Sequence, residues 1–343
     1  MKRGVANFIP GRLSQARSRR GIKKKDLAEK LGVSGEALRS YETGAARPLP
    51  DKVHRMSEVL DFPEHFFSTA MLKTGSPHVF WRDLKSVTKG SREAVDARVE
   101  FACEAFAVLD DYVEFPDLQL PKLDLPAHWP DITDEDIEAA AEACRSDWGL
   151  GDYPIPDMTL AAENIGVPVL APVIENRKQS GFAHWDEVTG RPFIGHNIRH
   201  TTAARARFNI ANELGHVLLH RSVAKDDLEN LAFFNHIEKQ AHRFAGALLF
   251  PRTAFYREVR YASLSAFELL KRDWNISILA QIVRARQLGI IDVNRAATLF
   301  AAAGREGYRS TNGEPYDDTV PVETPRMMRR AVDAIEDAGE MHL

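Results

Sequence analysis

Apolar residues recur at helical spacing through the first 70 residues, and short polar turns separate the apolar groups. The pattern predicts five helices: one around Leu13 and Ala16, one over Lys24–Leu31, one from Gly35 to Thr43, one from about Pro50 to Leu60, and a short one holding Phe66 and Phe67. Gly32 can supply the positive φ of a tight turn, and Ser34 is a good N-cap for the third helix. This stretch therefore predicts a compact all-helical domain.

The pattern becomes mixed beyond residue 80. A helical period runs from Phe80 to about Phe115, and we interpret it as a connecting helix that could serve dimer contacts. Residues 116–133 are rich in proline, which predicts a domain boundary there. The following elements alternate: helices at Asp134–Trp148 and Pro156–Gly166, strands at 167–170, 181–185 and 192–197, and a long helix carrying Ala204–His220. A small sheet followed by helices is an α+β arrangement.

The C-terminal part is helical again. Helices are predicted at Leu264–Lys271, Ser277–Leu288 and Asn294–Ala303. The order from Leu270 to Ile290 superficially resembles a helix-turn-helix, but its exposed residues are not strongly basic, so we interpret it as a packing element. The polar sequence after Gly304 predicts a loosely attached tail that ends in one short helix.

Charge is distributed unevenly along the 343 residues. Residues 1–60 hold 14 Lys/Arg and 6 Asp/Glu, a net charge of +8, whereas the remaining residues hold 31 and 43, a net charge of -12. A basic N-terminal segment followed by an acidic remainder is typical of a phosphate-binding module attached to a domain that does not bind nucleic acid.

Composition excludes several classes of protein. No window of about 18 uncharged apolar residues predicts a membrane span, and the first residues lack the apolar core of a signal peptide. The two cysteines, Cys103 and Cys144, form no CxxC pair, which excludes a disulfide framework and a cysteine zinc knuckle. We therefore expect a cytoplasmic protein.

The N-terminal helices resemble those of the Cro/phage-repressor (XRE) family. The residues that carry the resemblance are Leu27-Ala28-x-x-Leu31-Gly32-Val33-Ser34, Leu38, Tyr41-Glu42-x-Gly44 and Pro48. A helix, a glycine-containing turn and a second helix, with small Ala28 where the two approach, constitute a helix-turn-helix. The resemblance implies a domain that binds double-stranded operator DNA as a homodimer.

In that family the N-terminal part of the second helix enters the major groove. The resemblance implies that the groove-facing residues are Ser34, Gly35, Glu36, Arg39 and Ser40, and that Lys24 and Arg47 contact phosphates. Arg39 suits a guanine edge and Glu36 a cytosine amino group. Because Gly35 offers no side chain, we expect dimerisation and phosphate contacts to supply much of the affinity.

Two later segments resemble the ImmA/IrrE family of metallopeptidases. Asn212-Glu213-Leu214-Gly215-His216 matches the family's His-Glu-Leu-Gly-His, and Glu238-x-x-Ala241-x-x-Phe244-Ala245 matches its later Glu-x-x-Ala-x-x-Phe-Ala. The resemblance covers roughly residues 135–305. It implies a zincin-like domain in which two histidines and the later glutamate hold zinc, and the intervening glutamate is the general base. Glu213 takes the position of the base, and His216 and Glu238 take those of two metal ligands.

The chain departs from this pattern at the first ligand, where Asn212 replaces histidine. A neutral amide oxygen is a poor exchange for imidazole at zinc. We therefore expect zinc to be bound weakly or not at all, and the domain to be an inactive relative of the peptidases. A shifted site is an alternative, because His216 and His220 are also four residues apart, with Glu238 or His242 completing the set.

These observations predict a multi-domain, mainly α protein with an α+β zincin-like domain. It would comprise a five-helix Cro/repressor-type domain, a peptidase-like domain whose small sheet packs on helices, and a helical C-terminal part. The expected boundaries are a helix-turn-helix domain at 1–72, a helical connector and proline-rich linker at 73–133, a zincin-like domain at 134–255, a helical extension at 256–310, and a polar tail at 311–343.

Three functions fit these features. The first is a transcriptional regulator whose degenerate peptidase domain senses a ligand, either a small-molecule effector or a protein partner. The second is an active zinc metallopeptidase that cleaves a repressor. The third is an antitoxin-like protein of a toxin-antitoxin or phage-associated system, in which the acidic body neutralises a partner. We favour the first because the helix-turn-helix is intact and Asn212 replaces a ligand.

Overall fold

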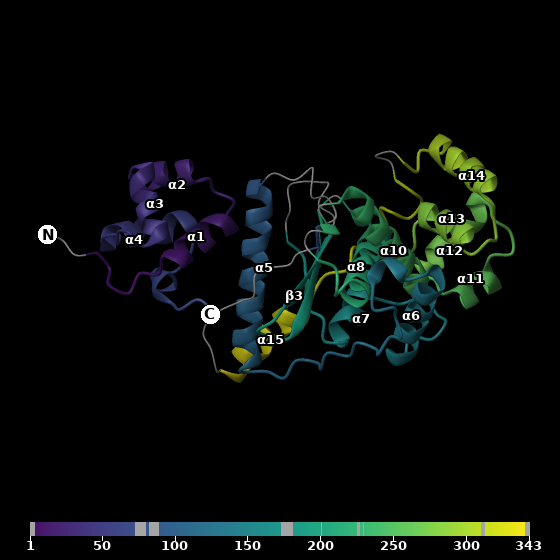
Figure 1. Ribbon diagram of the computed structural model, residues 1–343, viewed down its shortest axis with the longest axis horizontal. Helices are drawn as coiled ribbons and strands as arrows, with labels where there is room; N and C mark the ends of the chain where they lie inside the picture. The colour runs from purple at the N-terminus through teal and green to yellow at the C-terminus, as the bar shows by residue number, and fades with distance from the viewer. Residues whose placement is uncertain are drawn as a thin grey trace. The chain divides into compact units, whose positions relative to one another are not determined.

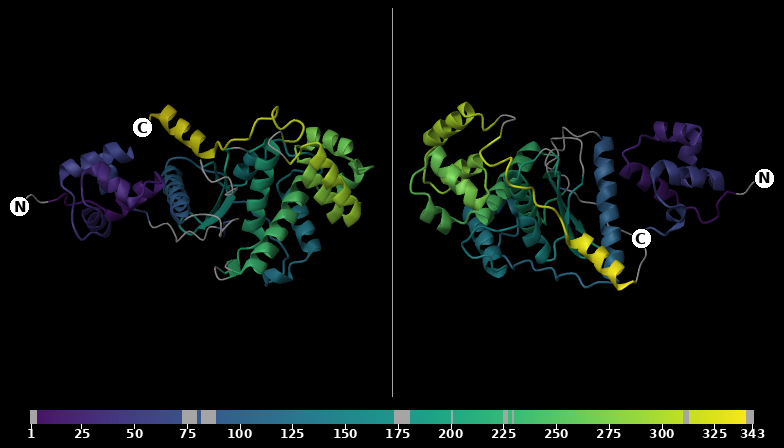
Figure 2. Two further views of the ribbon diagram at one scale, coloured as in Figure 1. Left: turned by 90° about the horizontal axis from the view of Figure 1, so that it is seen from above. Right: turned by 180° about the vertical axis from the view of Figure 1, so that it is seen from behind.

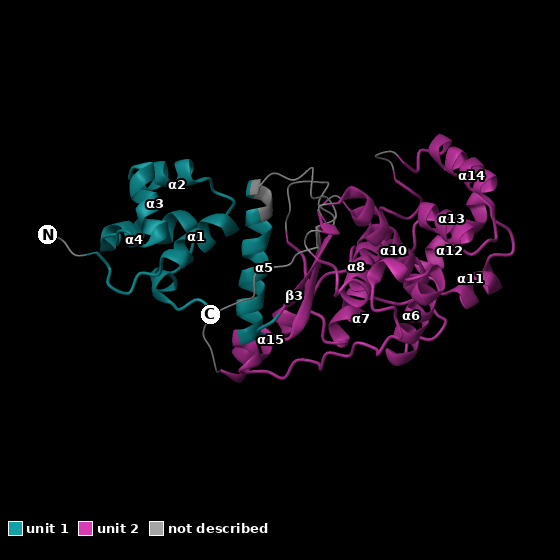
Figure 3. Cartoon of the chain, viewed as in Figure 1, with its two compact units in different colours: residues 1–77, 85–107, 187–189 teal, residues 78–84, 108–186, 190–343 magenta. Residues whose placement is uncertain are grey.

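A computed structural model describes residues 4–72, 80–81, 89–172, 181–199, 201–224, 227–228, 230–309 and 313–339. The chain divides into two compact units (Figure 3). Unit 1 comprises Met1–Pro77, Lys85–Ala107 and Glu187–Thr189, and unit 2 comprises His78–Leu84, Val108–Asp186 and Gly190–Leu343. No helix in the described ranges is both long enough and apolar enough to cross a membrane.

Unit 1 contains the five predicted N-terminal helices. They are α1 (Pro10–Arg19), α2 (Lys24–Leu31), α3 (Gly35–Thr43), α4 (Pro50–Leu60) and the 3-10 helix η1 (Glu64–Ser68) (Figure 1). Proline occupies the first position of both α1 and α4, where its missing N–H costs nothing. Gly32 adopts a left-handed φ of 61° at the end of α2, and the Ser34 side chain accepts a hydrogen bond from the Ala37 N–H. The local signals in the sequence thus set the bounds of these helices.

One apolar core holds these helices together. Its fully buried members come from all five helices and include Leu13, Leu27, Leu38, Met56 and Phe67. Because each helix contributes one apolar stripe to a shared interior, none of them would be stable alone.

The long helix α5 (Lys89–Asp110) adds to this core. The Phe101 ring stacks on Phe66 with 5.5 Å between centroids, and the Arg19 guanidinium lies over the Phe101 ring at 4.8 Å from its centroid. Arg12 forms a buried ion pair with Glu104 at 2.5 Å. The segment interpreted as a connecting helix therefore also packs on the N-terminal helices.

Unit 2 is built on a four-stranded sheet. Its strands are β1 (Phe80–Trp81), β2 (Val169–Leu170), β3 (Gly181–Asp186) and β4 (Arg191–His196), in the order β1-β3-β4-β2. The β3–β4 pair is an antiparallel hairpin, and β2 runs parallel to β4. The expectation of a helix beginning at Phe80 is wrong: Phe80 and Trp81 pair with Ala183 and Phe182 of β3, so pairing at a sheet edge overrides the helical period there.

Helices surround the sheet and extend away from it (Figure 1). They are α6 (Asp134–Asp147), α7 (Met158–Asn164), α8 (Ala203–Leu219), α10 (Leu231–Leu249), α11 (Arg252–Glu258), α12 (Leu264–Trp274), α13 (Ile278–Gln287), α14 (Val293–Arg305) and α15 (Met327–Ala338), with the 3-10 helix η2 (Trp129–Asp131) before α6. Helix α8 packs on β3 and β4 with one side and on α10 with the other. This α+β core confirms the predicted fold class.

Helices α12 and α13 have the outline of a second helix-turn-helix. Asn275 takes a left-handed φ of 49° between them, and Ser277 caps α13 by accepting from the Ala280 N–H. However, Gln281 and Arg284 of α13 are buried, with 0% and 2% exposure. The helix that would have to enter a groove is therefore packed into the interior, in line with the interpretation of this region as a packing element.

The polar segment from Gly313 to Met327 is firmly attached, contrary to the expectation of a loose tail. Figure 2 shows it running along unit 2 from the region of α13 to α15. Glu314 accepts from the backbone N–H groups of Ile278 and Leu279 at the start of α13, and Glu323 accepts from those of Met158 and Thr159 at the start of α7. Carboxylates at helix N-termini accept from otherwise unsatisfied N–H groups and interact favourably with the helix dipole. A polar segment can therefore be held firmly on the domain through its acidic side chains.

Candidate functional site

The exposed face of α3 carries most of the residues expected to face the major groove. Ser34, Gly35, Glu36 and Arg39 are exposed and Ser40 is partly so, whereas Leu38 is fully buried on the opposite side. A Cβ built on Gly35 would meet nothing within 4 Å. The surface is therefore open, and Glu36 and Arg39 are its long side chains with hydrogen-bonding ends.

The two residues expected to contact phosphates are placed differently. Lys24 keeps a 61% exposed side chain, but its Nζ lies 2.8 Å from Glu42 Oε2, and Glu42 is buried between Lys24 and Arg17. Arg47 is exposed, and the chain beside it is fixed by a hydrogen bond from Val5 N–H to Pro48 O. Glu42 was not anticipated from the sequence, although Tyr41-Glu42 stands in the motif that carried the resemblance.

The second site lies where α8 and α10 meet in unit 2. His216 of α8 and Glu238 of α10 approach each other, with 3.1 Å between His216 Nε2 and Glu238 Oε1. The close approach depends on small residues: a Cβ on Gly215 would lie 3.1 Å from the Phe244 ring and 3.3 Å from Ala241 Cα. The small residues Gly215 and Ala241 thus allow α8 and α10 to pack closely, and this packing brings the side chains of His216 and Glu238 together.

Asn212 lies one turn before His216 on the same face of α8. It is completely buried, and neither Nδ2 nor Oδ1 has a hydrogen-bond partner among the described residues. A buried amide without partners costs free energy and calls for an explanation such as an ion or a ligand. Its oxygen is therefore available as a metal ligand on the same face of α8 as His216.

Glu213, the expected general base, is also buried on α8. Gly181 at the start of β3 leaves room for it, because a Cβ on Gly181 would lie only 2.3 Å from Glu213 Oε1. The role of Gly181 could not be found from the sequence, since the strand and the helix are distant along the chain.

His220, proposed as an alternative ligand, is the C-cap of α8 and is completely buried. Its Nδ1 lies 3.0 Å from His216 Nδ1, and its Nε2 lies 3.0 Å from Gln240 Oε1. Burial, and secondarily the neighbouring His216, lowers the pKa of His220 well below its usual value. Desolvation of the buried ring therefore disfavours the charged form of His220 at this helix end.

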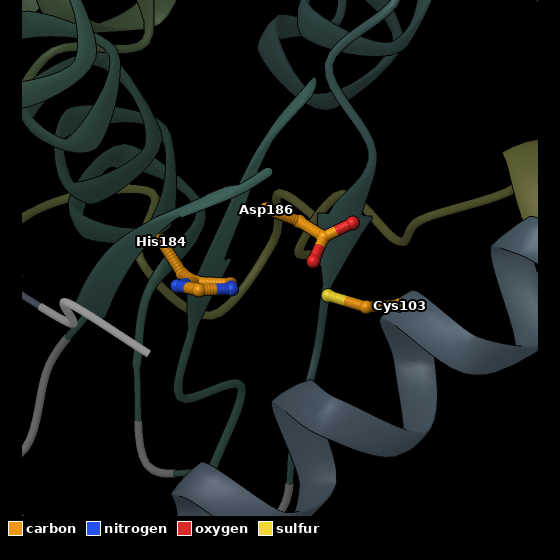
Figure 4. Close-up of side chains that lie close together, drawn as sticks. All are labelled: Cys103, His184 and Asp186. Atoms are coloured by element: carbon orange, nitrogen blue, oxygen red, sulfur yellow. The ribbon is translucent and has the colours of Figure 1, made fainter. Parts of the chain in front are cut away.

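Three further histidines of unit 2, at positions 184, 196 and 242, also have defined places. The His242 ring is 37% exposed, with Nε2 3.8 Å from Glu238 Oε2. His184 lies within β3 two residues before Asp186, so both buried side chains belong to one face of the strand (Figure 4). His196 is the last residue of β4, and burial lowers its pKa to about 4. His200 lies outside the described residues.

The residues present fit a weakly held divalent cation. His216 Nε2 and Glu238 Oε1 are a nitrogen and a carboxylate oxygen, which zinc accepts, and Asn212 Oδ1 is a neutral third donor. In the part of the chain that the structure describes, no third histidine, cysteine or carboxylate joins His216 and Glu238 to form a group with all ligand atoms within 4.8 Å of one another. A third ligand atom beside His216 and Glu238 would therefore have to come from Asn212, which stands where the family pattern given above has its first histidine.

Comparison with protein families finds a known domain around each of the two candidate sites. A helix-turn-helix domain matches residues 11–65, and an IrrE N-terminal-like domain matches residues 162–286. The chain is a fusion of these two domains. No curated protein is significantly similar to it. The IrrE-like match includes α8 and α10 with their motifs and extends through most of α13.

The chemistry of the IrrE-like domain follows from these placements. A bound zinc ion would supply Lewis acidity and lower the pKa of a coordinated water. His216 and Glu238 would hold the ion, and Glu213 stands next to Asn212 on the same helix as the group that could accept a proton. With an amide as third donor, the ion would be held less firmly than by a histidine.

Proposed function

We propose that this protein is a transcriptional regulator that binds operator DNA through α3, and that its IrrE-like domain senses a ligand or partner instead of cleaving peptides. The exposed N-terminal face of α3, with Arg39 and Glu36 on it, carries the DNA-binding part of the proposal. The basic net charge of residues 1–60 supports it through attraction to phosphates. Because the protein must reach operator DNA, we place it in the cytoplasm. We further propose that it acts as a homodimer.

The sensing part of the proposal rests on Asn212. The domain keeps Glu213, His216 and Glu238 but replaces the first ligand, so it would bind a divalent cation too weakly to sustain hydrolysis. Such a domain can still change conformation when a ligand or partner occupies it, and this would alter DNA binding if the two states differ in affinity.

Selection of duplexes from a random-sequence pool by the full-length protein tests the DNA-binding part. We expect enrichment of a sequence with approximate twofold symmetry, since each half-site of such an operator meets one copy of α3. Failure to enrich any sequence over a non-binding control protein would contradict the proposal.

An active zinc peptidase is the second candidate, and the retained pair of His216 and Glu238 favours it. Metal content after desalting separates the two functions. We expect almost no zinc in the wild-type protein after a desalting column, because a weakly held ion dissociates. One zinc per chain would favour the peptidase.

Replacing Asn212 by histidine should raise the affinity for zinc at least about tenfold, because imidazole replaces a neutral amide at the third ligand position. A competition titration against a fluorescent chelator measures the change, and the variant should also retain zinc through desalting. Asn212→Ala serves as the control, since it removes the amide without adding a ligand. An unchanged affinity in Asn212→His would mean that the pocket no longer has the geometry of a zinc site.

A further inference from the structure

The helical extension at residues 256–310 is basic, although the rest of the chain after residue 60 is acidic. The extension holds 9 Lys/Arg and 5 Asp/Glu, a net charge of +4. The other residues after residue 60 hold 22 Lys/Arg and 38 Asp/Glu, a net charge of -16. A basic region of this kind attracts an acidic surface.

Exposed tyrosines and arginines form a patch on α11, on the loop that follows it and at the start of α14. The members of this tyrosine–arginine patch are Tyr153, Tyr256, Arg257, Arg260, Tyr261 and Arg295. Tyr153, Tyr256 and Tyr261 are 72%, 56% and 82% exposed. Tyrosine and arginine are enriched in protein interfaces and supply much of their binding energy. The patch therefore has the composition of an interface.

Hydrogen bonds join the segments that carry the patch. Arg257 Nη2 donates to Asp152 O at 3.3 Å, which holds the loop of Tyr153 beside α11, and it also pairs with Glu258. Arg295 Nη2 donates to Ala262 O at 2.9 Å, which holds the start of α14 beside the loop after α11. A carbonyl oxygen carries no net charge, so this contact leaves the positive charge of Arg295 in place.

A hollow of about 600 Å³ lies elsewhere in unit 2, where the chain leaves α5. The acidic residues that line this acidic hollow are Asp110, Asp111, Glu114 and Asp117. Tyr112, also in the lining, is 50% exposed. Arg191 lines the hollow too, but its guanidinium donates to Pro116 O and Gly166 O. The hollow and the tyrosine–arginine patch are thus complementary in charge.

We propose that the tyrosine–arginine patch of one copy of the chain binds the acidic hollow of a second copy. This inference rests on the homodimer of the proposed function and assigns the surfaces that form it. In a twofold dimer the contact occurs twice, because the patch of each copy meets the hollow of the other. Every copy carries both surfaces, so the partner is present wherever the protein is.

The absence of lysine from the patch favours a protein partner over nucleic acid. Surfaces that bind phosphates use lysine as well as arginine, whereas protein interfaces are depleted in lysine. Lys271 is the only lysine in residues 256–310. It is 3% exposed, and its Nζ lies 2.9 Å from Glu314 Oε2 in a buried ion pair. The cations that the extension exposes are therefore all arginines.

Sedimentation velocity of the full-length protein without DNA tests the contact through charge reversal. Arg260 and Asp111 are exposed, and among the described residues neither side chain has a hydrogen bond or an ion pair, so Arg260→Glu and Asp111→Arg should not disturb the fold. Each substitution should raise the dissociation constant of the dimer at least ~10-fold, because like charges then face each other. The wild-type dimer should also weaken at high salt.

Mixing the two variants tests whether these two surfaces meet. An equimolar mixture of Arg260→Glu and Asp111→Arg again places opposite charges at both contacts, so it should recover most of the lost affinity. Arg305→Glu is the matched control, since it makes the same charge change at an exposed residue in the last turn of α14, ~15 Å along the helix from Arg295. It should leave the dissociation constant unchanged.

The outcomes separate this inference from the proposed function. A wild-type dimer that neither reversal weakens would overturn the assigned surfaces and leave the homodimer intact, as would reversals that the mixture does not rescue. A wild type that stays monomeric would overturn the homodimer and this inference together. Binding of a fluorescent oligothymidylate that is lost in Arg260→Glu, with the dimer unaffected, would assign the patch to nucleic acid instead.

Discussion

Replacing Arg39 by alanine should weaken binding to the selected operator by ~1–3 kcal/mol, because a bidentate contact from arginine to a guanine edge has about that value. Arg39 is exposed on α3, one turn into the helix that begins at Gly35. Leu38 beside it fixes the helix in the core, so the substitution should not disturb the fold. A gel-shift titration at fixed salt measures the loss.

Arg47→Ala provides the contrast for this experiment. A residue that contacts phosphate should weaken binding to all sequences alike and reduce the slope of log K against log salt by ~1. Arg39→Ala should instead weaken the selected operator more than an unrelated duplex. Unchanged operator affinity in Arg39→Ala would mean that α3 does not read the groove as we propose.

Replacing Arg284 by methionine should lower the free energy of unfolding of unit 2 by ~3–5 kcal/mol, because it leaves a buried carboxylate without its main partner. Both guanidinium ends of Arg284 bind Glu138, at 2.6 and 2.7 Å, and each side chain is only 2% exposed. Arg284 Nε also donates to Phe250 O, and Arg243 lies 3.1 Å from Glu138. The cluster therefore joins α6, α10 and α13.

Urea denaturation followed by tryptophan fluorescence measures this change selectively. All five tryptophans, at 81, 129, 148, 185 and 274, belong to unit 2. Arg252→Met is the matched control, since Arg252 pairs with Glu135 and Glu142 in a more exposed setting and should cost no more than ~1 kcal/mol. The double variant Arg284→Met/Glu138→Leu should recover part of the loss, because it removes the uncompensated charge as well. Equal losses of unfolding free energy in Arg284→Met and Arg252→Met would contradict the prediction that the buried pair of Arg284 and Glu138 contributes more to stability than the exposed pairs of Arg252.

Local signals in the sequence are sufficient to predict where the helices of the N-terminal domain begin and end. Gly32, Ser34 and the prolines at positions 10 and 50 act within a few residues of where they stand, through φ, capping and a missing N–H. For the same reason the sequence is sufficient to assign the residues on the exposed face of α3. The paired strands β3 and β4 followed from their alternating pattern and the turn between them.

The predictions were wrong for two segments whose conformation depends on residues distant along the chain. Phe80 and Trp81 fit a helical period, yet the edge of β3 recruits them as a strand. The sequence after Gly304 is polar, which suggested a loose tail, yet Glu314 and Glu323 dock onto the N-termini of α13 and α7. In both cases a long-range partner decided between two conformations that the local sequence permits.

The sequence by itself determined which residues the proposed cation site can contain, because His216, Glu238 and the substituted Asn212 are read from two helical motifs. Only the tertiary structure decided the roles of Gly181, His220 and Gln240. Gly181 makes room for Glu213 from another element, and Gln240 orients His220 only because Trp129 and Ile132 place their carbonyls beside it. Hydrogen bonds between segments more than 100 residues apart leave no periodic signal in the chain, so the contacts of Gln240 with Trp129 and Ile132 follow from the fold alone.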